Sequence, residues 1–69
     1  MNDVLQEQIY KFVKIYTENN HHAPHSIHQI ATCLEESEGS VRDEIIRMVD
    51  RGVLERETGR NNSPILIKE

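Results

Sequence analysis

Three stretches of the chain repeat apolar residues at the three- and four-residue spacing of a helix. We therefore expect helices over residues 2–20, 27–34 and 38–51. Each helix has one apolar stripe, and the three stripes predict a common core. The stripe residues are Leu5, Ile9, Phe12, Val13, Tyr16, Ile27, Ile30, Ala31, Leu34, Val41, Ile45, Met48 and Val49.

Residues that begin and end helices stand at the borders of these stretches. Ser26 and Ser37 precede the second and third stretches, where a serine hydroxyl can accept hydrogen bonds from the free amides of the first turn. Asn19–Asn20 and Gly52 follow the first and third stretches, because both residue types tolerate the left-handed backbone that ends helices. Residues 35–36 leave room only for a tight connection between the second and third helices.

The last part of the chain has the pattern of a β-hairpin. Apolar, β-branched runs at residues 53–56 and 65–68 flank a segment rich in Gly, Asn and Pro. We expect one domain, mainly α with a small β-hairpin (α+β). The order helix, helix, tight turn, helix, hairpin is typical of a winged helix-turn-helix with a two- or three-stranded wing sheet. In that fold the third helix can enter a DNA major groove, which is about 12 Å wide.

Several segments resemble a family of bacterial repressors. Residues 34–42 (LEESEGSVR) and 50–55 (DRGVLE) are similar to the turn, recognition-helix start and wing junction of winged-helix repressors. Together with residues 8–13, 23–31 and 59–67, they resemble the N-terminal DNA-binding domain of the LexA family. The resemblance implies that the chain binds duplex DNA as a dimer on a two-fold operator and represses transcription. The sequence has no counterpart of the family's self-cleaving domain, so we expect no induction by autoproteolysis.

The resemblance also implies which residues would touch DNA. The base-reading face would consist of Ser37, Gly39, Ser40, Arg42 and Asp43, and the wing would contribute Arg60, Asn61 and Asn62. Arg47 lies off the apolar stripe of the third helix, so it is a further candidate for a base or phosphate contact. The alternative for Arg42 and Arg47 is a solvated pair with a neighbouring acid, since adjacent acids such as Asp43 and Glu44 are expected at the surface. For the wing residues, the alternative is an ordinary polar loop.

The charge balance weakens the inference of DNA binding. The chain has 8 Lys and Arg against 12 Asp and Glu, a net charge of −4 with His neutral. Residues 38–51 sum to −1, and residues 56–69 to +1. An alternative function is therefore an acidic winged-helix module that binds another regulator or protein complex instead of DNA. Ile46 and Leu66, off the main stripes, are candidates for contact with a second copy.

Other chemistry is weakly represented. His21, His22, His25, His28 and Cys33 do not have the paired spacing of a zinc site, so we expect no metal and no cofactor. Cys33 is expected to be a small buried apolar residue. No nucleophile–base pattern indicates an enzyme. No apolar run approaches the 18–20 residues of a membrane span, and the N-terminus lacks the order of a signal peptide, so we expect a cytoplasmic protein without membrane contact.

Overall fold

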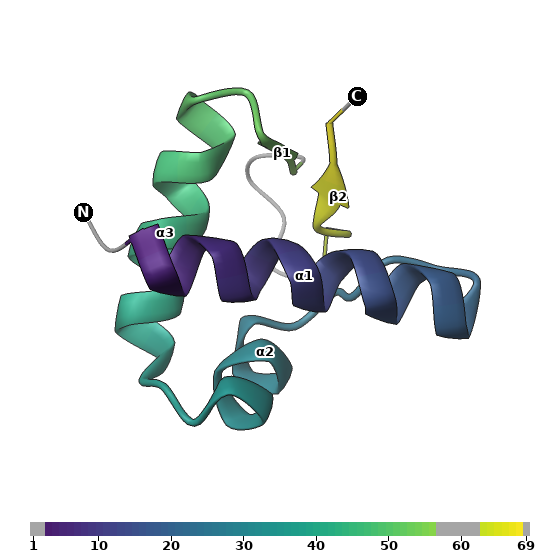
Figure 1. Cartoon of the computed structure of the whole chain (residues 1–69), viewed down its shortest axis with the longest axis horizontal. Coiled ribbons are helices and arrows are strands. Elements are labelled where there is room, and N and C mark those ends of the chain that lie inside the picture. Colours follow the sequence, from purple (N-terminus) through teal and green to yellow (C-terminus); the bar gives the residue numbers. More distant parts are fainter. Residues whose placement is uncertain (1–2, 57–62, 69) are drawn as a thin grey trace.

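The computed structural model describes residues 3–56 and 63–68. Within them, three helices precede a small antiparallel sheet, which confirms the mainly helical α+β class (Figure 1). The elements are α1 (Asp3–Asn20), α2 (Ile27–Leu34), α3 (Glu38–Asp50), β1 (Leu54–Glu55) and β2 (Leu66–Ile67).

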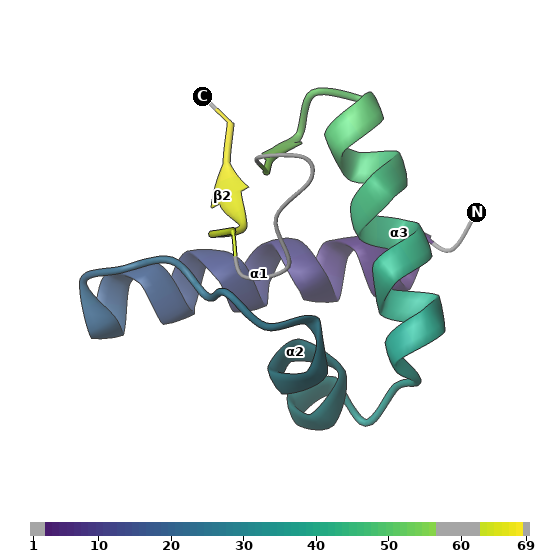
Figure 2. The same cartoon turned by 180° about the vertical axis from the view of Figure 1, so that it is seen from behind.

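The longest helix, α1, is the platform on which the other elements pack. It contacts α2, α3 and β2, while α3 also contacts α2 and β1. Both views show α3 crossing the N-terminal half of α1, with α2 and the sheet on opposite sides of α1 (Figures 1 and 2). As a consequence, one face of α3 is covered by the rest of the molecule and the other is left uncovered.

The core lies where the three predicted stripes meet. Every stripe residue is buried or partly buried, so the periodicity predicted the core faces correctly. Leu54 and Ile65 complete the core from the sheet side. The buried cluster consists of Leu5, Ile9, Val13, Ile30, Ala31, Val41, Ile45, Met48, Leu54 and Ile65.

The serine caps form as the sequence predicts. The Ser26 hydroxyl accepts a hydrogen bond from the backbone N–H of Gln29 at 3.2 Å, and the Ser37 hydroxyl accepts one from the N–H of Ser40 at 3.2 Å. At the other end of α3, Gly52 has the expected left-handed backbone, with φ 78°. Ser37 and Gly52 therefore define the two ends of α3.

The expected end of α1 at Asn20 is confirmed, but Asn20 is not the residue that adopts the left-handed backbone. The left-handed residue is His21, with φ 60°, and its N–H still donates to the Thr17 carbonyl at 2.9 Å. The Asn20 side-chain amide instead donates to the Tyr16 carbonyl at 3.0 Å. Asn20 is thus the last helical residue and satisfies a carbonyl of the last turn, and His21 provides the left-handed residue that follows the helix.

The connection between α2 and α3 is as tight as predicted. Glu35 is left-handed, with φ 57°, and the N–H of Glu36 donates to the Ala31 carbonyl at 2.9 Å. These bonds end α2 and redirect the chain, so that α3 begins at Glu38 with Ser37 as its cap.

The predicted hairpin strands pair, but they are shorter than expected. Leu54 lies opposite Ile67 and Glu55 opposite Leu66. Between Ile65, which is buried, and Ile67, which is partly buried, Leu66 points outward with 39% exposure, so the expected alternation is confirmed. The described part of the chain has no third strand. Instead, the Ile65 N–H donates a hydrogen bond to the Pro24 carbonyl at 2.9 Å, which joins the loop before α2 to the chain just before β2.

Candidate nucleic-acid interface

The buried and exposed faces of α3 follow from its sequence. Because successive residues turn by about 100°, Val41, Ile45 and Met48 share one face, and all three are buried. The exposed face lies on the opposite side of the helix. It includes Gly39, Arg42, Asp43, Ile46 and Asp50, and it is flanked by the exposed residues Glu38, Ser40 and Arg47.

The residues expected to touch DNA on α3 all lie at the surface. Ser37, Gly39, Ser40, Arg42 and Asp43 are exposed and gather at the cap and first turns of α3. The two serines also bond to each other, since the Ser37 hydroxyl donates to the Ser40 hydroxyl at 2.9 Å. A Cβ built on Gly39 would meet open space, so packing within the protein does not require glycine there.

Arg42 is not engaged by its neighbours. No hydrogen bond or ion pair joins it to another residue in the described part of the chain, and the same holds for Asp43. Nearby Glu38 instead lies 3.2 Å from Nδ1 of His28, across the turn from α2. The expected alternative, in which Arg42 pairs with an adjacent acid, is therefore not the arrangement in this structure.

Arg47 is arranged differently, and the surface position expected for Glu44 is wrong. The Glu44 side chain is only 8% exposed, and its Oε2 accepts a hydrogen bond from Nη1 of Arg47 at 3.0 Å. Its Oε1 accepts a second bond from Nε2 of Gln6 on α1 at 2.9 Å. Arg47 thus takes the pairing alternative and helps to compensate a buried carboxylate.

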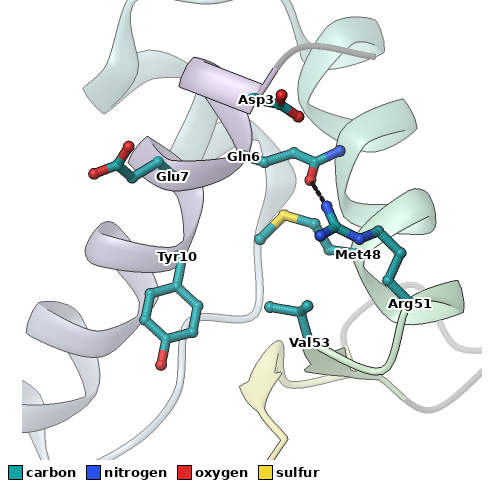
Figure 3. Close-up of a pocket in the computed structure, with 7 residues that line it drawn as sticks. All are labelled: Asp3, Gln6, Glu7, Tyr10, Met48, Arg51 and Val53. Carbon is teal, nitrogen blue, oxygen red and sulfur yellow. Dashed lines mark hydrogen bonds between the residues drawn. The ribbon is translucent and has the colours of Figure 1, made fainter.

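The same network continues to the C-terminal end of α3. Nη1 of Arg51 donates to Oε1 of Gln6 at 2.6 Å, above a small pocket that Met48 and Val53 help to line (Figure 3). Gln6 therefore lies between Glu44 and Arg51 and ties both to α1. Two of the three cations of residues 38–51, Arg47 and Arg51, are exposed but paired within the molecule, which leaves Arg42 as the unpaired cation of this segment.

The sequence did contain a signal for this network. Gln6 stands at i, i+3 and i+7 with Ile9 and Val13, and Glu44 stands three residues after Val41 and four before Met48. Both polar residues thus lie on the core stripes of their helices. Because both side chains are polar, neither residue contributes to the apolar spacing that identifies the stripes.

At the wing, the structure describes only the base. Arg60, Asn61 and Asn62, the expected wing contacts, lie outside the described residues. On the two sides of that segment, Nε of Arg56 donates to the hydroxyl of Ser63 at 3.2 Å, and Ser63 is buried. This bond joins the two arms of the hairpin close to β1 and β2.

The remaining candidate chemistry is dispersed. Cys33 is exposed, contrary to expectation, because it lies off the stripe of α2 that Ile30 and Ala31 direct into the core. Within residues 3–56 and 63–68, no three His, Cys, Asp or Glu side chains are grouped so that they could hold a metal ion. Across the same residues, no helix has the length and apolar character needed to cross a membrane.

Comparisons with protein-family models, with curated proteins and with solved structures gave no match to this chain.

Proposed function

We propose that the chain is a winged helix-turn-helix repressor that binds duplex DNA in a sequence-specific manner. In this proposal α3 enters the major groove, and the wing residues Arg60, Asn61 and Asn62 contact the backbone or the minor groove. The observation that carries the proposal is the uncovered start of α3, with Arg42 exposed and unpaired directly after a tight helix–turn–helix connection.

Two features of the local geometry support this role. Gly39 and Ser40 are small, and the absence of a side chain at Gly39 allows the backbone to approach a groove closely. Arg42 can form paired hydrogen bonds with guanine, and Asp43 can accept a hydrogen bond from the amino group of cytosine. The sheet that bears the wing lies beside the C-terminal end of α3 (Figure 2).

The electrostatics predict weak binding to random DNA. Arg47 and Arg51 are held in the network with Glu44 and Gln6, so Arg42 is the unpaired cation of residues 38–51. If a monomer makes two to four phosphate contacts, the logarithm of its binding constant falls with the logarithm of salt concentration with a slope of about −2 to −4. Specific binding would then depend on base contacts and on two copies sharing one operator, with exposed Leu66 as a candidate contact between them.

The test is selection of bound duplexes from a random pool, followed by fluorescence anisotropy on the selected sequence. Wild type is expected to recover a two-fold sequence, and Arg42→Ala to bind it about 5- to 150-fold more weakly. Lys14→Ala is the matched control, because Lys14 is an exposed cation on α1 and the charge change is the same. Recovery of no sequence, together with no binding to any duplex at low salt, would reject the proposal.

The second candidate is an acidic protein-interaction module. The observation that favours it is that Arg47 and Arg51, although exposed, already donate hydrogen bonds to Glu44 and Gln6 and are therefore less available to phosphates. In that case the chain would bind a basic regulator through α3 and would not bind duplex DNA at any salt concentration. The anisotropy experiment therefore separates the two candidates.

A further inference from the structure

Ile46 occupies the middle of the exposed face of α3. It lies seven residues after Gly39 and four before Asp50, so these three residues form one line opposite the buried face. Its side chain is 53% exposed, although isoleucine is normally favoured inside a protein.

The neighbours of Ile46 indicate what kind of surface would cover it. Arg42 and Asp43 lie one turn before it and Asp50 one turn after it, and all are exposed. A protein interface normally buries a contiguous group of apolar side chains at its centre. Here a single isoleucine is bordered by charges, which does not match such an interface.

The three kinds of side chain on this face, a guanidinium, a carboxylate and an apolar group, match the edges of base pairs in a major groove. An arginine fits guanine, a carboxylate fits the amino group of cytosine, and an apolar side chain fits the 5-methyl group of thymine. We propose that Ile46 contacts a thymine 5-methyl group and thereby selects a thymine in each half-site. This inference rests on the DNA-binding function proposed above.

The spacing along α3 places that thymine relative to the base pair that Arg42 contacts. Four residues of helix correspond to a rise of about 6 Å, and successive base pairs are about 3.4 Å apart. The thymine is therefore expected within about two base pairs of the base pair contacted by Arg42. This assignment is an alternative to the contact with a second copy that the sequence suggests for Ile46.

The test uses the duplex that wild type selects, with each thymine changed in turn to deoxyuridine, which lacks only the 5-methyl group. One position in each half-site is expected to lose about fourfold in affinity, the equivalent of about 0.8 kcal/mol for one buried methyl group. With Ile46→Ala the difference between thymine and uracil at that position should disappear. Ile15→Ala is the matched control, since Ile15 is 56% exposed on α1, and it should retain the difference.

The possible outcomes separate this inference from the proposed function. If wild type binds a selected duplex but no uracil substitution matters, or if Ile46→Ala keeps the same thymine preference, the Ile46 assignment is overturned and DNA binding stands. If Ile46→Ala instead abolishes self-association in sedimentation without changing the thymine preference, Ile46 belongs to a protein contact. If no duplex is bound, both proposals fail. Circular dichroism of each variant verifies that the fold is retained.

Discussion

Substitution of Gln6 by alanine tests the network that joins α1 to α3. Gln6 is buried, and its amide donates to Glu44 at 2.9 Å while its carbonyl oxygen accepts from Arg51 at 2.6 Å. The alanine variant leaves Glu44 buried with one fewer donor. Arg47 still pairs with it, so the carboxylate loses only part of its compensation.

The expected cost follows from the loss of these bonds. A hydrogen bond to a charged group contributes about 1.5–3 kcal/mol, so Gln6→Ala should lower the free energy of unfolding by about 2 kcal/mol. For a chain of 69 residues, total stability is about 3–10 kcal/mol, which makes this loss a large fraction of it. The midpoint of thermal unfolding should fall by about 8–16 °C.

The assay is thermal and urea unfolding followed by circular dichroism. Gln8→Ala is the matched control, because Gln8 is an exposed glutamine two residues away on α1, and it should change stability by less than about 0.5 kcal/mol. A double-mutant cycle of Gln6→Ala with Glu44→Ala should give a coupling free energy of about 1–2 kcal/mol. If Gln6→Ala is no more destabilising than Gln8→Ala, or if the coupling is zero, the reasoning about the network is refuted.

Three further predictions concern α3 and its borders. Arg42→Ala should weaken binding to the selected duplex by about 1–3 kcal/mol without altering the unfolding midpoint, whereas Lys14→Ala should change neither. Arg47→Ala should instead lower the free energy of unfolding by about 1 kcal/mol in urea titration, since it removes a donor from a buried carboxylate. An unchanged midpoint of urea unfolding together with weakened DNA binding would contradict this prediction. Gly39→Ala should raise the free energy of unfolding by about 0.5 kcal/mol while reducing DNA affinity. Gly52→Ala should lower the free energy of unfolding by about 1 kcal/mol, because Gly52 has a positive φ. Equal effects of the two substitutions on the free energy of unfolding would contradict the assigned geometry.

The helices and their core faces could be predicted because their signals are local. Apolar spacing places Ile9, Ile30 and Ile45 in the core, and Ser26 and Ser37 cap the helices that follow them. The end of α1 at Asn20 was predicted correctly, but the left-handed residue could not be identified from residue preference alone. Asparagine tolerates left-handed geometry, but at Asn20 the side chain satisfies a helix carbonyl and the left-handed conformation falls on the next residue.

The candidate interface was predictable only in part. Helical spacing sufficed to place Arg42 and Asp43 on the exposed face, because that face is fixed by the buried one. The pairing of Arg47 with Glu44 spans only three positions and was one of the alternatives expected from the sequence, whereas the contact of Glu44 with Gln6 spans 38 positions. The positions of Gln6 and Glu44 on the core stripes indicate that both are buried, but not that they contact each other. The local pattern therefore left open whether Arg47 faces DNA or compensates a buried acid.

The most direct test of DNA binding through α3 is nitrogen-15 amide chemical-shift mapping of the full chain during titration with its selected duplex. Amide shifts are expected to be largest over residues 37–46 and small over residues 14–19 on the distal half of α1. The opposite distribution, or no shift at DNA concentrations up to the millimolar range typical of very weak binding, would contradict the account.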